Sequence, residues 1–125
     1  MLNSVEILKM ASAMARHAAD RHQVISQNIA NADTVGYKAK DLEPFAESYA
    51  RMAARVTGAE NGAPGGNAWR TELVDVPGVA SPNGNTVSIE DQMMRSVEAQ
   101  QQHEAATAIY RKTMNIMRMS LGRNV

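Results

Sequence analysis

Small and apolar side chains in the first third of the chain follow a heptad pattern. They recur at alternating steps of three and four residues, which is the spacing of a helix seam packed against a partner helix. No Pro or Gly occurs before Gly36, so the pattern predicts a helix over residues 4–31. Asn3 and Glu6 have the spacing of a capping box at its start. The predicted seam consists of Leu8, Ala11, Ala15, Ala18, His22, Ile25, Ile29 and Ala32.

A second seam runs through the last third of the chain. Residues 88–121 contain no Pro or Gly, and their spacing again predicts a helix. Ser88 and Asp91 form a cap signal at its start, and Gly122 supplies the stop. Acidic side chains open this helix and basic ones close it, an order that complements the helix dipole. The predicted seam consists of Ile89, Met93, Ser96, Gln100, His103, Thr107, Tyr110, Met114, Met117 and Leu121.

The centre of this second seam is polar, at Ser96, Gln100 and His103. A stable two-helix coiled coil would carry Leu or Ile at such positions. Two interpretations stay open. Either these residues set the register against the N-terminal helix or between subunits, or the helix is rotated so that they face solvent.

The middle of the chain is less regular. Residues 41–56 predict a short amphipathic helix, in which Pro44 fits the first turn. Residues 57–86 are rich in Gly, Pro and Asn and resemble a loop, with a short strand predicted over 69–76 and a tight turn at Asn83-Gly84. The apolar face of the middle helix consists of Leu42, Phe45, Tyr49, Met52 and Val56.

Together these patterns predict a mainly α chain. Its long N- and C-terminal helices pair as a coiled-coil-like inner domain, with a short middle helix and an irregular loop region that is partly β or disordered. We divide the chain into an N-terminal helix and turn (1–35), a middle region (36–87) and a C-terminal helix (88–125). Both ends are expected to form one domain.

Composition removes several classes of function. The 13 basic and 13 acidic side chains balance, so the net basic surface typical of nucleic-acid binding is missing. No apolar run approaches the roughly 18 residues that a membrane span requires, and the first residues lack the pattern of a cleavable signal peptide. His17 and His22 fall on different helix faces, which does not suit a metal site, and no phosphate-binding loop or nucleophile elbow occurs. We therefore expect no catalytic residue, no metal and no cofactor.

One stretch, residues 25–38, differs from a generic coiled coil. Asn28 and Asn31 lie near the helix end, where Asn side chains can bond freed backbone carbonyls. Asp33 and Thr34 favour a turn, and Gly36 offers a left-handed exit. An ordinary helix terminus followed by a turn would account for these features as well.

This stretch resembles the N-terminal signature of the bacterial flagellar rod, hook and hook-associated family, roughly N-x-A-N-x-x-T-x-G-Y. Val35 departs from it, since the proximal rod branch often carries Pro there. Residues 83–93 resemble that branch's entry into the C-terminal helix, and residues 57–86 leave no room for the β-rich insertions of distal rod and hook proteins. The middle rod branch is the nearest alternative. The matching residues are Asn28, Ala30, Asn31, Thr34, Gly36 and Tyr37.

The resemblance implies a structural subunit of the proximal rod rather than an enzyme. In this family the terminal helices pair into an inner layer, and subunits stack helically around an export channel. The implied partners are further copies of the chain, other rod subunits, the membrane-ring adaptor protein and the export gate, with no nucleic acid and no direct membrane insertion. The implied location is the periplasmic rod, reached by export without a cleavable signal peptide, and the implied role is to link these parts and transmit torque. A soluble helical adaptor would explain the seams but not the signature.

Overall fold

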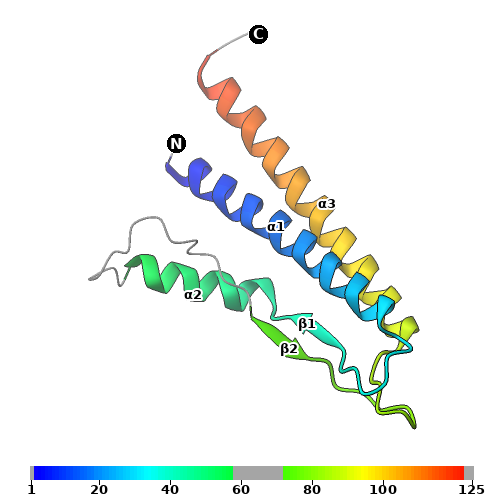
Figure 1. Cartoon of the computed structure of the whole chain (residues 1–125). Coiled ribbons are helices and arrows are strands. Elements are labelled where there is room, and N and C mark those ends of the chain that lie inside the picture. The colour runs from blue at the N-terminus through cyan, green and yellow to red at the C-terminus, as the bar shows by residue number, and fades with distance from the viewer. Residues whose placement is uncertain (1, 58–71, 123–125) are drawn as a thin grey trace.

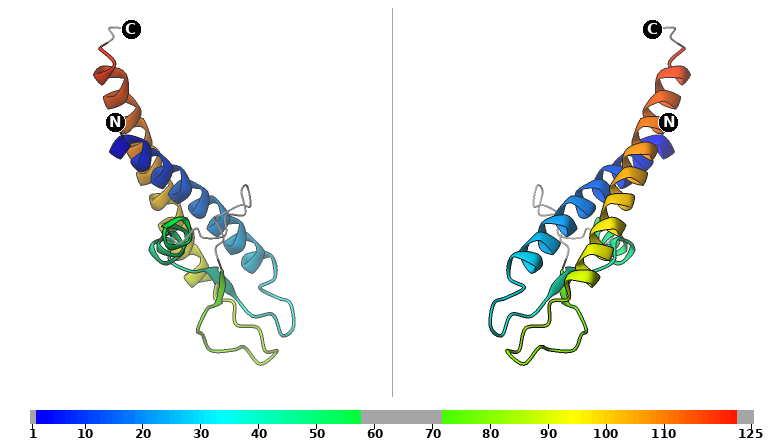
Figure 2. Two further views of the ribbon diagram at one scale, coloured as in Figure 1. Left: turned by 90° about the vertical axis from the view of Figure 1, so that its left-hand side faces the viewer. Right: turned by 90° about the vertical axis from the view of Figure 1, so that its right-hand side faces the viewer.

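The computed structural model describes residues 2–57 and 72–122 and is mainly helical, as predicted. Two long helices, α1 (Leu2–Ala30) and α3 (Ile89–Ser120), lie side by side and run in opposite directions (Figures 1 and 2). A short helix, α2 (Phe45–Thr57), and a two-stranded sheet lie along one side of this pair. The antiparallel arrangement is fixed by polar contacts between the long helices, namely Asn28 with Gln92, Arg21 with Glu98, and His17 with Gln102.

The interface between α1 and α3 is lined mainly by small side chains. On α3 the buried positions recur every seven residues, and on α1 three buried apolar residues do the same. Because Ala side chains are short, the two helix backbones can approach closely, but each contact removes little apolar surface from water. The residues at these heptad positions are Ala11, Ala18 and Ile25 on α1 and Gln92, Ala99, Ala106 and Thr113 on α3.

The α3 seam that packs against α1 is not the predicted one. Each buried residue precedes a predicted seam residue by one position, so Met93, with 61% of its surface exposed, follows the buried Gln92. Ile89, Tyr110 and Leu121 are exposed, whereas Met114 and Met117 are half-buried. The polar centre also turns outward at Gln100 and His103. This exposure contradicts the interpretation that the two residues set the register against α1 and agrees with the alternative, a helix rotated so that they face solvent. A register contact between subunits stays a hypothesis.

The α1 seam is only partly as predicted. Ala11, Ala18 and Ile25 are buried and Leu8 is half-buried, but His22 is exposed and Ile29 is 40% exposed. The structure turns α1 so that polar residues, His17 and Asn28, are buried instead. Hydrophobic spacing alone could not show this, because two neighbouring stripes of the helix both follow alternating steps of three and four residues. The polar contacts determine which of the two stripes is buried.

The predicted ends of α3 are confirmed. The Ser88 side chain accepts a hydrogen bond from the Asp91 amide, and the Gly122 amide donates to the Met119 carbonyl. Gly122 has φ +72°, a left-handed conformation that favours Gly. The predicted capping box of α1 is wrong, because Asn3 lies inside the helix and not before it.

The middle helix begins later than predicted. Strand β1 (Lys40–Leu42) takes Asp41 and Leu42, and pairs antiparallel with β2 (Leu73–Asp75) so that Asp41 faces Val74. Pro44 precedes α2, and its carbonyl accepts from the amides of the first turn.

The predicted apolar face of α2 is half-buried at Phe45, Tyr49 and Met52, while the Val56 side chain lies outside the description. Phe45 stacks on Tyr49 with a centroid separation of 5.5 Å. The predicted strand 69–76 is present over 73–75, and residues 69–71 lie outside the described part. The turn at Asn83-Gly84 is confirmed, closed by a hydrogen bond from the Gly84 amide to the Ser81 carbonyl.

Replacing Ala106 by Leu should push the long helices apart, because Ala106 is fully buried between them. Overpacking of this kind costs about 1–3 kcal/mol. Urea unfolding followed by circular dichroism should show that loss. Ala105→Leu, one residue away on the exposed face, is the matched control. Equal stability of the two variants would contradict the Ala-lined interface.

Candidate assembly site at the end of the helix pair

The signature turn ends α1 through its own hydrogen bonds. The Asn31 side-chain amide donates to the Gln27 carbonyl at 2.8 Å, and the Thr34 amide donates to the Asn31 carbonyl at 3.0 Å. Gly36 then adopts φ +72°, the left-handed exit that the sequence predicted. Thr34 and Ala30 remain exposed. The local chemistry of the turn is therefore the predicted one for Asn31 and Gly36.

The structure brings the two blocks that carried the resemblance into direct contact. The buried Asn85 donates from its side-chain amide to the carbonyls of Asn31 and Thr34, at 2.8 and 2.7 Å. The Gly36 amide donates to the Asn83 carbonyl, and a Cβ on Gly84 would lie 3.4 Å from the Gly36 Cα. The turn after α1 and the turn before α3 thus form one unit at the lower end of the molecule in Figure 1.

Asn28 is the centre of this end of the molecule. Its side chain is fully buried, and its carboxamide nitrogen donates to the Lys40 carbonyl at 2.6 Å and to Gln92 Oε1 at 2.9 Å. Its oxygen accepts from the Lys40 amide and from the Tyr37 hydroxyl, both at 3.1 Å. The carboxamide therefore pairs with the Lys40 backbone as a neighbouring strand would, while also holding α3.

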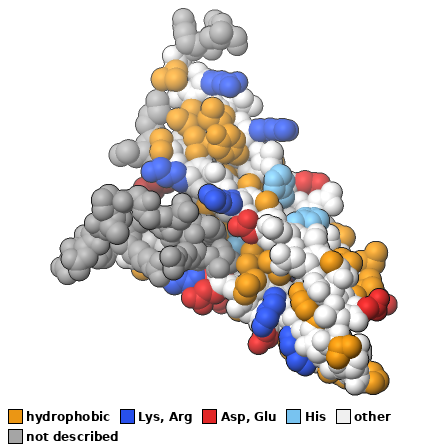
Figure 3. Space-filling model, viewed as in Figure 1, with side chains coloured by type: hydrophobic (Ala, Val, Ile, Leu, Met, Phe, Trp, Pro, Cys, Tyr) orange, Lys and Arg blue, Asp and Glu red, His pale blue; other side chains and the backbone are white. Residues whose placement is uncertain are grey.

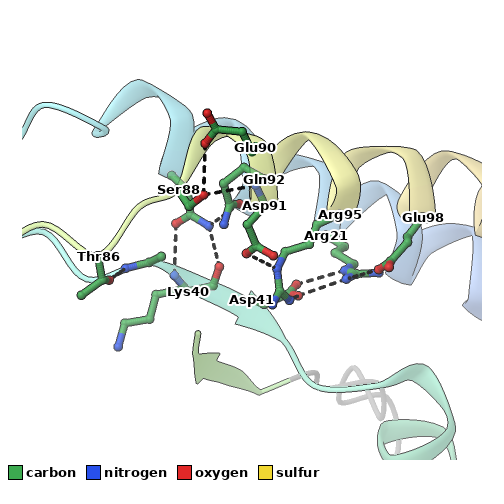
Figure 4. Close-up of polar contacts among 12 residues, drawn as sticks. Arg21, Lys40, Asp41, Thr86, Ser88, Glu90, Asp91, Gln92, Arg95 and Glu98 are labelled. Carbon is green, nitrogen blue, oxygen red and sulfur yellow. Dashed lines mark hydrogen bonds and ion pairs between the residues drawn. The ribbon is translucent and has the colours of Figure 1, made fainter. Parts of the chain in front are cut away.

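Asp41 forms a second link between the same elements. It is buried, and it binds Arg21 of α1 through two oxygens at 3.1 Å and Arg95 of α3 at 2.6 Å (Figure 4). Arg21 also binds Glu98, and Arg95 also binds Asp91. Burial by itself raises the pKa of Asp41, but hydrogen bonds from Arg21, the Leu42 amide and Arg95, with the charge of Arg21, outweigh it. The net pKa lies below the ordinary value.

A third set of contacts joins α1, α2 and the sheet. His17 is buried, and its Nε2 donates to the Glu43 carbonyl at 2.8 Å, so its Nδ1 accepts from Gln102 at 3.1 Å. The Glu43 carboxylate pairs with Arg51 and accepts from the Glu72 amide. The hydrogen bond from Arg51 is the main reason that the pKa of Glu43 lies below its usual value.

These groups are engaged with one another and leave little for chemistry on a ligand. Across residues 2–57 and 72–122, no group of three or more metal-ligating side chains is found, and no helix is long and apolar enough to cross a membrane. A cavity of about 420 Å³ beside Arg21, Asp41 and Arg95 is lined by these same ion-paired residues. The arrangement is suited to holding helices and sheet in fixed positions.

Sequence reasoning identified part of this site. It singled out Asn28, Asn31, Gly36 and Tyr37, and the structure joins them. It missed several buried or half-buried polar residues outside the signature. Asn85 and Gln92 lay within the second resembling block and could have been found there, whereas nothing in the spacing marked the others. The missed residues are Arg21, Asp41, Asn85, Gln92 and Arg95.

Asn28→Asp should destabilise the fold by about 2–4 kcal/mol, because a carboxylate would face the Lys40 carbonyl and Gln92 Oε1 without a donor. Urea unfolding near pH 7 measures the change. Gln27→Glu makes the same replacement at an exposed neighbouring position and should change stability little. A mild effect at both positions would show that Asn28 is not the clamp described.

Asp41→Asn should reduce stability by about 2–3 kcal/mol at pH 7, less than for a fully buried pair because both Arg side chains reach solvent. Since the folded pKa of Asp41 is depressed, its contribution is complete above the unfolded pKa of about 4 and is lost as pH falls through the folded value. The difference between wild type and variant should therefore narrow below pH 4. Unfolding curves from pH 7 to pH 2 test this, with the exposed Asp33→Asn as control. A difference that stays constant over that range would exclude the ionised Asp41 as its cause.

Comparison with known proteins agrees with this geometry. Residues 10–38, which include the signature turn, match the family model described as "Flagella basal body rod protein". The chain is 24% identical over 131 residues to the flagellar basal body rod protein FlgB of Agrobacterium fabrum (strain C58 / ATCC 33970), an alignment that covers 98% of this chain and 97% of that protein. The matched signature and the agreement along nearly the whole length make this chain similar to the flagellar basal body rod protein family and, within it, to FlgB.

Proposed function

We propose that the chain is a structural subunit of the proximal rod, assembled helically around the export channel. The observation that carries this proposal is the polar clamp formed by Asn28, Lys40 and Gln92, which fastens the end of α1 to β1 and to the start of α3. A clamp of this kind makes both ends of the chain one unit. A subunit that is stacked between neighbours needs such a unit.

The proposed mechanical role is to link the membrane ring and export gate to the rest of the rod and to transmit torque. Torque shears neighbouring helices past one another, so the contact between α1 and α3 must resist sliding. Apolar Ala contacts resist sliding along the helix axis only weakly. Hydrogen bonds and ion pairs resist it more strongly, because the helices cannot shift without breaking them. Asp41 supplies such bonds to Arg21 and Arg95, one on each long helix.

The proximal position within the rod is favoured over the middle position by the relative named FlgB, which matches this chain over nearly its whole length. The proposed partners are further copies, the next rod protein, the membrane-ring adaptor and the export gate. The proposed location is the periplasmic rod, reached by flagellar export without a cleavable signal peptide. A soluble helical adaptor would need neither the clamp nor the signature turn.

A host strain that lacks the gene should be non-motile and should have no complete rods in electron micrographs. Wild-type chain and Gln27→Glu should restore both, and the wild-type chain should be detected by mass spectrometry in purified basal bodies. Asn28→Asp should restore motility poorly, because the clamp is lost. Normal rods in the deletion strain, or a chain found only outside basal bodies, would refute the proposed function.

A further inference from the structure

Part of the predicted seam is left uncovered at the lower end of the helix pair. Ile29 and Met93 each follow one residue after Asn28 and Gln92, which are hydrogen-bonded to each other. Each step of one residue rotates the side-chain direction around the helix axis. Because α1 and α3 are antiparallel, this step turns Ile29 and Met93 to the same side of the helix pair. Arg95, which is turned to the opposite side of α3 from Met93, binds Asp41 of β1, so Ile29 and Met93 lie on the side turned away from the sheet. Ile89, one helical turn before Met93, is exposed as well.

At the other end of the pair, apolar side chains at the end of α3 are exposed. α3 continues past the start of α1, so its last turns extend beyond its partner helix (Figures 1 and 2). Met119 is 75% exposed and Leu121 is 65% exposed, and Ile116 is also exposed. Figure 3 shows hydrophobic side chains gathered near this end, with Lys and Arg side chains around them.

The two ends of α3 also differ in charge. All acidic residues of α3 lie at or before Glu104, and every charged residue of α3 after Glu104 is basic. Glu90 lies beside Met93 near the start, and Arg118 lies beside Met119 near the end. Within residues 2–57 and 72–122 neither Glu90 nor Arg118 has an ion-pair partner.

We propose that the C-terminal end of α3 in one copy docks on the uncovered patch at the lower end of a second copy. The apolar end, Ile116, Met119 and Leu121, would cover the patch, Ile29, Ile89 and Met93, with Arg118 facing Glu90. The inference rests on the proposed function and deepens it by naming the surfaces through which copies of the chain meet.

Charge complementarity is the reason for choosing a second copy as the occupant. The helix dipole accounts for the order of charges along α3, but it does not account for apolar side chains exposed beside each charge. Two different surfaces meet in this contact, so one copy of a joined pair keeps its patch free and the other keeps its apolar helix end free. Such a heterologous contact propagates into a ring or a filament, while a self-complementary contact would stop at a dimer.

Engineered cysteines test the contact directly, since the chain contains no Cys. Met93→Cys and Met119→Cys proteins, each full length, are mixed and oxidised mildly, both in solution and in basal bodies from cells that express both. The mixture should give a disulfide dimer, identified by mass spectrometry, while each variant alone should give several-fold less. Ile89→Cys with Leu121→Cys is a second pair, in case one variant fails to fold. Gln101→Cys, exposed elsewhere on α3, is the control partner for Met119→Cys.

Charge exchange tests the ionic part of the contact. Glu90→Lys in the Met93→Cys protein, or Arg118→Glu in the Met119→Cys protein, should each lower the crossed dimer about two- to fivefold, the scale of an exposed ion pair. Combining the two changed proteins should restore it. A crossed product no greater than with Gln101→Cys, in solution and in basal bodies alike, would overturn the proposal, as would equally abundant dimers of Met93→Cys alone.

The two proposals fail in different ways. If the chain is present in basal bodies but the crossed disulfide is absent, the contact is wrong and the proposed function stands. If the crossed disulfide forms but the chain is absent from basal bodies, the contact stands and the proposed function falls.

Discussion

The fold depends on the buried carboxamide of Asn28. One side chain makes four hydrogen bonds, two to the Lys40 backbone, one to Tyr37 and one to Gln92. An amide without partners would be costly in this fully buried position, so the helix, the strand and the second helix must all be in place together. The same requirement fixes how far α1 is rotated about its axis and how far α3 is shifted along it.

This constraint explains why the interface can be built from small side chains. An Ala-lined contact between helices is permissive, since it has few large side chains that interlock and could slide by a turn at little cost. The polar contacts at His17, Arg21 and Asn28 remove that freedom, because each has a specific partner on the sheet or on α3. Specificity comes from buried polar groups, and close approach comes from Ala. Gln92 shows the cost of this solution, because its side-chain nitrogen is buried and has no partner among the described residues.

The rotation also decides what the subunit presents to its surroundings. Because Gln92 and Ala99 are turned inward, Met93 and Gln100 are turned outward. A long thin pair of helices cannot cover such residues by itself, so that surface stays exposed in the single chain. The acidic residues near the start of α3 and the basic residues near its end give the two exposed apolar surfaces opposite charges. This difference is the basis for the head-to-tail contact proposed above.

The sequence by itself determined the long helices, the cap at Ser88, the stop at Gly122 and the turn through Gly36. These features depend on neighbouring residues, whose propensities and hydrogen bonds act within a few positions. Only the tertiary structure decided which stripe of each helix is buried. From the sequence the apolar Met93 is a better core residue than the polar Gln92, yet Gln92 is the buried one. It also decided that Asp41 belongs to a strand and not to the middle helix. In both cases the deciding partner, Asn28 for Gln92 and Arg21 for Asp41, is distant in sequence, and local spacing carries no information about a polar bond that forms only when the chain folds back.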